Sequence, residues 1–135
     1  MTVAPAPWAE LLAELGRTPD RLRALAPDPA AAPLIESLCA FELPYRAGLV
    51  RIILEDNPEL PPEPGPENAE SPRPWPAIIE HFAALRRDTL AFLEHLPPEA
   101  RARVASHPSL GRVTLRQQVE ALLAHDAAAL HSLRQ

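Results

Sequence analysis

The sequence predicts an all-α protein, a four-helix bundle with a long crossover between the second and third helices. Four long segments place their apolar residues at helical rather than alternating spacing. The 18 prolines are clustered, and the clusters fall mainly between these segments. At 135 residues, and without an internal repeat, the chain has the length of a single domain covering residues 1–135.

The first helical segment runs from about residue 8 to residue 25. One face of it is apolar and carries Trp8, Leu11, Leu12 and Leu15. Thr18 followed by Pro19 is typical of an N-cap with proline in the first helical turn. We therefore expect the helix to restart at this point.

The second segment spans about residues 33 to 55. Its apolar arc consists of Leu34, Leu38, Phe41, Tyr45, Leu49 and Ile52. Pro44 interrupts this arc, and a proline inside a helix removes one backbone hydrogen bond and clashes with the preceding turn. We therefore expect a kink or a break at Pro44.

A polar, proline-rich connection follows over residues 57 to 76. A connection of this length inside a compact domain needs an explanation. Twenty extended residues can reach about 66 Å, whereas a helix of the same length covers about 30 Å. The connection can therefore cross the whole bundle, so that the second and third helices run parallel.

The third helix is expected from residue 76 or 77 to about residue 96, and its apolar face carries Ile78, Phe82, Leu85, Thr89, Phe92 and Leu96. The fourth begins after Thr114, which forms a capping-box pattern with Gln117. Its inward face carries Leu115, Val119, Leu122 and Leu133. No segment has the pattern of a β-strand, so we expect no sheet.

Composition argues against several classes of function. The 13 arginines are dispersed among acids, the chain has no lysine and its net charge is −5. A nucleic-acid-binding protein should have a basic face, so we expect no nucleic-acid partner. No basic amphipathic helix and no apolar run long enough to span a bilayer is present, so we expect no membrane contact. The first residues do not resemble a signal peptide, and we expect a cytoplasmic protein.

Two helices carry reactive side chains on or beside their inward faces. On the second helix Glu42 lies inside the apolar arc, with Cys39 one turn earlier. On the fourth, Asp126 lies on the inward face with His125 beside it. Together they suggest a metal or substrate site, in which Glu42 and Asp126 are the candidate substrate-binding residues.

A purely structural interpretation carries more weight at this stage. A single inward glutamate most often pairs with an arginine, and Arg46 lies one turn from Glu42. Cys39 then serves as a small apolar side chain, since a buried free cysteine usually does. His125 and Asp126 then form a satisfied polar contact near a helix end.

Three passages resemble the DinB-like superfamily of four-helix proteins. They are RTPDRLRAL from Arg17, FAALRRDTLAFLEHLPPE from Phe82, and HPSLGRVTLRQQVEALLAHD from His107 to Asp126. Together with the matching order of the helices, these passages cover most of the chain. The resemblance implies a DinB/YfiT-like bundle, which agrees with the helices expected above.

Members of this superfamily typically bind a divalent metal ion through three histidines. The resemblance maps the first onto Cys39, keeps the second as His125 and maps the third onto Ala129, which cannot bind metal. It also places Glu42 at an acidic family position and Pro44 at another. The implied ligands are therefore Cys39 and His125, with Glu42 as the candidate third, and we expect zinc or nickel to bind weakly or not at all.

Three functions remain open on this basis, and whether the chain is an enzyme is undecided. The first is an interaction or binding protein that has lost its metal. The second is a metal-dependent enzyme similar to the bacillithiol S-transferases of the superfamily. The third is a metal-free binder of a small cationic molecule, held by Glu42 and Asp126. We also expect a homodimer, because the resemblance implies pairing. In addition, part of the apolar face that carries Trp8, Leu11, Leu12 and Leu15 is expected to exceed what one small core covers.

Overall fold

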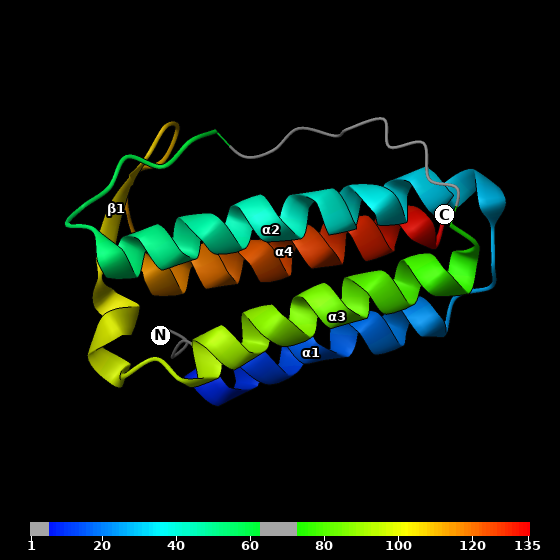
Figure 1. Cartoon of the computed structure of the whole chain (residues 1–135), viewed down its shortest axis with the longest axis horizontal. Coiled ribbons are helices and arrows are strands. Elements are labelled where there is room, and N and C mark those ends of the chain that lie inside the picture. The colour runs from blue at the N-terminus through cyan, green and yellow to red at the C-terminus, as the bar shows by residue number, and fades with distance from the viewer. Residues whose placement is uncertain (1–5, 63–72) are drawn as a thin grey trace, which may run out of the picture.

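The computed structural model describes residues 6–62 and 73–135. In these residues four helices pack side by side (Figure 1). They are α1 (Trp8–Arg23), α2 (Ala32–Leu54), α3 (Trp75–Glu94) and α4 (Leu115–Leu133). Short 3₁₀ turns, Pro29–Ala31 and Pro98–Ala102, precede α2 and follow α3. The four-helix bundle predicted from the sequence is confirmed.

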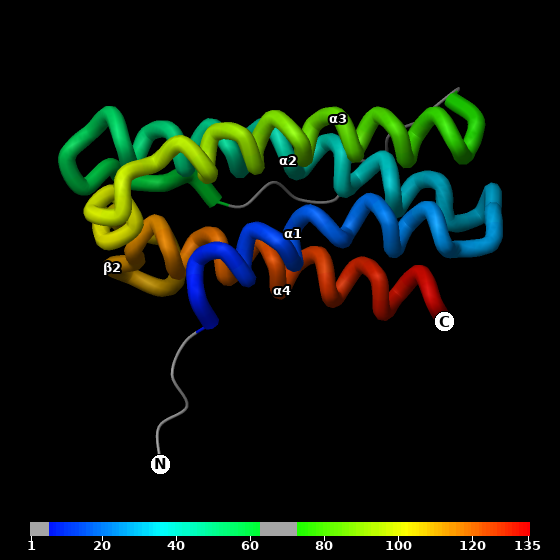
Figure 2. Tube along the Cα trace, turned by 90° about the horizontal axis from the view of Figure 1, so that it is seen from below, coloured from blue at the N-terminus to red at the C-terminus, as the bar shows by residue number. Residues whose placement is uncertain are grey.

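The order of the helices in space also agrees with the prediction. α3 and α4 each pack against both α1 and α2. α2 and α3 run in the same direction, and α1 and α4 run in the opposite one (Figures 1 and 2). The chain must therefore return along the whole bundle between α2 and α3, as the crossover predicted at residues 57–76 requires. Residues 63–72 of that connection lie outside the described part of the chain.

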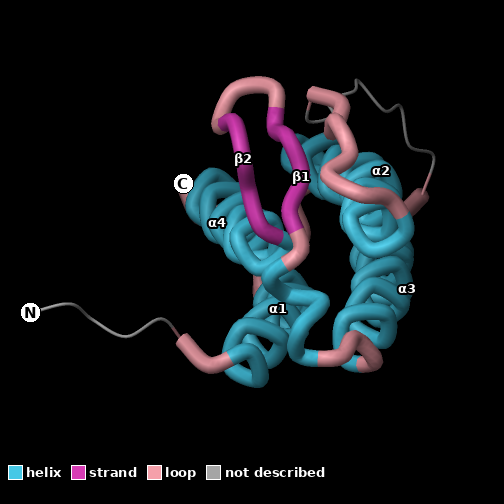
Figure 3. Tube along the Cα trace, turned by 90° about the vertical axis from the view of Figure 1, so that its left-hand side faces the viewer, coloured by secondary structure: helices cyan, strands magenta, loops and turns pink. Residues whose placement is uncertain are grey.

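A two-stranded antiparallel hairpin lies between α3 and α4, and our expectation of no sheet is wrong. Its strands are β1 (Val104–His107) and β2 (Gly111–Thr114), and Ala105 pairs with Val113. The hairpin lies at one end of the bundle, beside α4 and α2 (Figure 3). Each strand has four residues, too few for alternation to be recognised. Gly111 adopts a positive φ of 74° after the turn, a conformation that glycine permits.

The start of the crossover pairs with this hairpin. The Leu60 amide donates to the Ser106 carbonyl at 2.9 Å, and the Ser106 amide donates to the Pro58 carbonyl at 2.8 Å. Glu59 thus forms one isolated parallel bridge with Ser106. These contacts hold residues 58–60, shortly after the end of α2, against the hairpin.

Both helices with an internal proline are continuous. α1 runs through Thr18 and Pro19 without the expected restart, and Thr18 does not cap a helix. α2 runs through Pro44 without a break. Pro44 is exposed, so the hydrogen bond that it removes lies on the side of α2 where water can replace it.

The fourth helix begins as predicted. The Gln117 amide donates to Thr114 Oγ1 at 3.1 Å, and the Thr114 amide donates to Gln117 Oε1 at 2.8 Å. This reciprocal pair is the capping box expected from the sequence. None of the helices among the described residues is long and apolar enough to cross a membrane.

Two apolar clusters fill the interior, one toward each end of the bundle. The first, nearer the hairpin, includes Leu15, Tyr45, Leu93 and Leu122, and the second includes Leu22, Cys39, Phe82 and Ala129. Between them, each helix contributes a polar residue that is almost wholly buried. These residues are Thr18, Glu42, Arg86 and Asp126, and we call them the polar layer.

The apolar face of α1 is used inside the chain. Trp8, Leu11, Leu12 and Leu15 are all at most 9% exposed and belong to the first cluster. The sequence argument that part of this face is surplus to the core is therefore wrong, and it gives no support to the predicted homodimer. Large apolar residues that are exposed lie elsewhere, at Leu43, Leu54 and Leu110.

Candidate functional site

The polar layer is the chemically unusual part of the interior. Thr18, Glu42, Arg86 and Asp126 each have a relative exposure of 1%. Charged side chains are rarely buried to this extent unless they are paired and hydrogen-bonded. The geometry around Arg86 meets that requirement.

Arg86 reaches its position because it lies on the inward stripe of α3. It follows Phe82 by one turn and precedes Thr89 by three residues, and all three are buried. Its guanidinium forms a two-pronged ion pair with Glu42 of α2. Nε donates to Oε2 at 2.9 Å and Nη2 donates to Oε1 at 3.0 Å. Both oxygens of Glu42 are thereby engaged.

The same guanidinium also binds Asp126 of α4. Nη1 donates to Oδ2 at 2.6 Å and Nη2 donates to Oδ1 at 3.0 Å. Thr18 of α1 donates its hydroxyl to Oδ2 at 2.7 Å. Arg86 Nη1 further donates to the backbone carbonyl of Leu15 at 3.0 Å. An arginine has five N–H donors, and here all five have acceptors.

This arrangement keeps Arg86 charged. Burial by itself would lower its pKa, but hydrogen bonds to Asp126 and Glu42 and the charges of both carboxylates raise the pKa above its ordinary value. The ring of Phe82 lies 4.9 Å from the guanidinium carbon and adds an attractive face. The interior of the bundle therefore contains a fixed cation bound by two acids.

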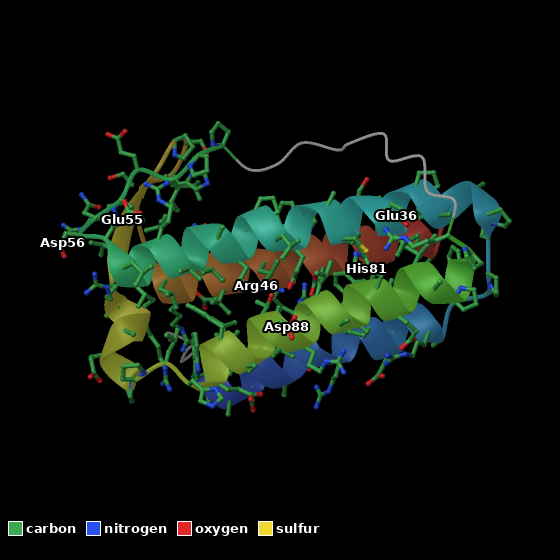
Figure 4. All side chains as sticks on the ribbon, in the orientation of Figure 1. Glu36, Arg46, Glu55, Asp56, His81 and Asp88 are labelled. Carbon is green, nitrogen blue, oxygen red and sulfur yellow. The ribbon has the colours of Figure 1, made fainter. Side chains whose placement is uncertain are left out.

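Arg46, which the sequence favoured as the partner of Glu42, binds elsewhere. It extends from α2 toward α3 (Figure 4), where its Nε donates to Thr89 Oγ1 at 2.8 Å and its Nη2 donates to the Leu85 carbonyl. Thr89 in turn donates to the carbonyl of Leu85 at 3.2 Å. The prediction that Glu42 pairs with an arginine is confirmed, but the residue is Arg86.

Cys39 is buried in the second apolar cluster. Its thiol Sγ lies 3.9 Å from the carbonyl oxygen of Ile78 on α3. Burial raises the pKa of the Cys39 thiol to about 12, and the neighbouring charge of Glu36 adds to the rise. A thiol in these surroundings holds its proton at neutral pH.

His125 lies at the interface of α4 with α2. Its ring stacks on Phe41 with centroids 3.8 Å apart and planes 7° apart, and Phe41 stacks on Tyr45 with centroids 5.1 Å apart. The Tyr45 hydroxyl donates to the Gln118 carbonyl at 2.6 Å. These contacts form a row of rings between the two helices, and they hold the face of the imidazole against an aromatic side chain.

The three positions that the family resemblance assigns to metal ligands do not fit a metal ion. Ala129 has no donor atom and lies in the same apolar cluster as Cys39. Both oxygens of Glu42, the candidate third ligand, accept from Arg86. Within residues 6–62 and 73–135, no group of three or more His, Cys, Asp or Glu side chains is arranged to hold a metal.

The structure brings together two of the residues singled out from the sequence, because Glu42 and Asp126 bind the same guanidinium. Cys39 belongs to the second apolar cluster, and His125 stacks on Phe41. Sequence reasoning did not identify Arg86 or Thr18. A signal existed for Arg86, since it lies on the apolar stripe of its helix, where a charged residue requires a partner.

Comparison with known proteins supports the fold. No protein-family model matches the chain, and no curated protein matches it. Among solved structures it is similar to YfiT from Bacillus subtilis, described as a probable metal-dependent hydrolase with an unusual four-helix bundle topology. The TM-score is 0.77 at 13% identity, over 98% of this chain and 88% of YfiT. The chain therefore has a four-helix bundle fold like that of YfiT.

Proposed function

We propose that this chain is a metal-independent binding or interaction protein built on a DinB/YfiT-like bundle, in which the family's three-histidine metal site has been lost. One observation carries the proposal: Glu42 and Asp126, which lie within three residues of mapped ligand positions in the sequence, hold an arginine of the chain itself. Glu42 and Asp126 both bind Arg86, and neither has an oxygen without a hydrogen bond.

The donor set supports the same conclusion. Catalytic zinc sites usually have three protein ligands and an open position. Of the three mapped positions, Ala129 has no donor atom, and Cys39 lies with it in the second apolar cluster. His125 alone is a poor site, because affinity for first-row metals comes from several ligands fixed in place.

The enzyme alternatives depend on this metal. YfiT is described as a probable metal-dependent hydrolase, and the S-transferase resemblance also implies a metal. Both would need ligands that the described residues of this chain do not assemble. A small cationic ligand between Glu42 and Asp126, the third alternative, would have to displace Arg86. For these reasons we favour binding through the outer surface of the bundle.

Self-association is part of this proposal, through α2 in place of α1. Apolar side chains on the outer face of α2 alternate at spacings of three and four residues, at Ala40, Leu43, Ala47, Val50 and Leu54. Leu43 is 51% exposed and Leu54 is 77% exposed. This spacing is typical of a seam between two helices, and a two-fold pair would present the same stripe from both copies. We therefore propose a homodimer that pairs α2 with α2.

Metal titration tests the loss of the metal site. Protein stripped with a chelator is titrated with zinc and with nickel by calorimetry, beside the double variant Cys39→His, Ala129→His. We expect little binding by the parent and an affinity higher by orders of magnitude in the variant, because it regains three imidazoles on two facing helices. One zinc bound by the parent at submicromolar dissociation constant would contradict the proposal.

A further inference from the structure

Arg86 is a single side chain that joins all the helices of the bundle. It belongs to α3 and hydrogen-bonds to Leu15 of α1, Glu42 of α2 and Asp126 of α4. We infer that its guanidinium is a built-in cation that has replaced the metal ion as the cross-link between α2 and α4. This inference rests on the proposed loss of the metal site.

The place of the cation supports this replacement. Glu42 follows Cys39 by three residues on α2, and Asp126 lies between His125 and Ala129 on α4. Three residues along a helix correspond to a rise of about 4.5 Å. The two carboxylates therefore lie within one helical turn of the three mapped ligand positions along α2 and α4. Arg86 joins the same two helices that those positions would have joined.

The number and origin of its contacts support it as well. A metal ion stabilises a fold because it draws ligands from separate elements to one point. Arg86 does the same with acceptors from three helices, and Thr18 adds a hydrogen bond to Asp126. A bound metal stabilises a protein only while it is bound. The arginine is covalently part of the chain, so its cross-link does not depend on the supply of metal.

The exchange of cations also changes what the site can do. A catalytic metal keeps an open position at which it binds and polarises a substrate. Every N–H of Arg86 is already bonded to the protein. The cross-link between α2 and α4 is therefore kept, but Arg86 has no open position at which a substrate could bind. This fits a bundle that acts through its surface.

The inference predicts a ligand for an altered protein. Removal of the Arg86 side chain beyond Cβ leaves an opening with Glu42, Asp126 and the Leu15 carbonyl around it. A guanidinium ion has the shape, charge and N–H donors of the group that was removed. A groove of about 390 Å³ between α1 and α3, lined in part by Gly16 and Arg86, gives it a route from solvent. The altered site should therefore select guanidinium.

The experiment follows thermal unfolding of Arg86→Ala by circular dichroism. Guanidinium chloride is added at millimolar concentrations, far below those that denature proteins, with sodium chloride, urea and zinc chloride in parallel. We expect guanidinium alone to raise the Tm of the variant by several degrees in a saturable way. The matched control is Arg87→Ala, the next residue of α3, whose side chain is exposed. Its Tm should not rise.

Several results would overturn the inference. They are the absence of any rise with guanidinium, an equal rise in Arg87→Ala, or stabilisation by zinc in place of guanidinium. If Arg86→Ala is unfolded, recovery of its helical signal with guanidinium is the same test, and failure to recover counts against the inference. Arg86→Lys gives a second measurement, because lysine keeps the charge but has three donors and no fork. We expect a Tm below that of the parent, and an equal Tm would contradict the inference.

These outcomes are separate from those of the metal titration. Suppose that the parent binds zinc tightly and that guanidinium stabilises Arg86→Ala. The proposed function and the replacement of the metal by Arg86 would then both be contradicted, and only the cross-linking of the helices by Arg86 would stand. A parent that binds no zinc and a variant that is not rescued would contradict the inference alone.

Discussion

Arg86 donates a hydrogen bond to the carbonyl of Leu15, the acceptor that Pro19 leaves without its usual helical donor. In an α-helix the amide of residue 19 would donate to this carbonyl, but proline has no N–H. The guanidinium of α3 takes the place of that donor at 3.0 Å. Arg86 thus supplies the hydrogen-bond donor that Pro19 lacks. α1 remains helical through Pro19, where the sequence predicted a new start.

This relationship predicts that the two residues are energetically coupled. A proline inside a helix ordinarily costs about 3 kcal/mol relative to alanine. Because Arg86 already supplies the missing donor, we expect Pro19→Ala to change the free energy of unfolding by less than about 1 kcal/mol. In an Arg86→Met background the same change should be more stabilising. A double-mutant cycle by urea denaturation measures the coupling, and purely additive effects would contradict it.

The general fold was predictable because the periodicity and the proline clusters act locally. The segments around Leu38 to Ile52 and Leu115 to Leu122 carry enough apolar residues at helical spacing to define both the helix and its buried face. The crossover followed from chain length alone. The β-hairpin was missed because its strands are only four residues long, and the turn from Pro108 to Gly111 was the remaining sign of it.

The site was predictable only in part, since it depends on which faces meet in space. Glu42 and Asp126 are marked by their position on apolar faces, and they do converge. The identity of their partner is a tertiary property. Arg46 was the nearer arginine in sequence, but its guanidinium lies against Thr89 of α3. Likewise, Thr18 resembles a cap locally and instead donates to a carboxylate 108 residues away.

The environment of Cys39 predicts a thiol that does not react in the folded protein. Burial raises its pKa from an ordinary 9.0 to about 12, so almost no thiolate exists near neutral pH. We expect a thiol reagent such as DTNB to label the native protein only at the rate of unfolding and to label it fully in urea. The chain has one cysteine, so all of the labelling reports on Cys39. Rapid labelling of native protein would contradict the burial.

The same shift in pKa predicts a dependence of stability on alkaline pH. The unfolded chain releases the Cys39 proton near pH 9.0, whereas the folded chain keeps it until about pH 12. The contribution to the free energy of unfolding is therefore fully present below pH 9 and is lost as pH rises toward 12. Comparison with Cys39→Ala cancels the other groups that titrate there. An identical pH profile for the two proteins would refute this assignment.

The proposed dimer predicts that charge on the outer face of α2 separates the copies. Leu43→Glu together with Leu54→Glu places acids on the exposed stripe without disturbing the core. We expect light scattering to show a dimer for the parent and a monomer for this variant at micromolar concentration. Leu110→Glu is the matched control, since Leu110 is 66% exposed but lies in the hairpin turn. A monomeric parent would refute the dimer.

The last prediction concerns the cost of breaking the polar layer. Arg86→Met removes the cation and leaves Glu42 and Asp126 buried without their partner. We expect the free energy of unfolding to fall by about 3–5 kcal/mol, the cost typical of an uncompensated buried charge. In the triple variant Glu42→Met, Arg86→Met, Asp126→Leu no buried charge of the layer is left without a partner. Urea denaturation should show that it recovers most of the loss, because apolar side chains of similar size can replace a buried ion network at little cost.

Comparison of the two variants separates charge from packing. Both lack the arginine, so a difference between them reports the two carboxylates that remain in Arg86→Met. Arg87→Met changes an exposed arginine of the same helix and should leave stability within about 0.5 kcal/mol of the parent. If the triple variant is less stable than Arg86→Met, the hydrogen bonds of the layer contribute more than its desolvation costs. In that case the cross-link stabilises the fold directly, and the single variant's loss cannot be attributed to unpaired acids.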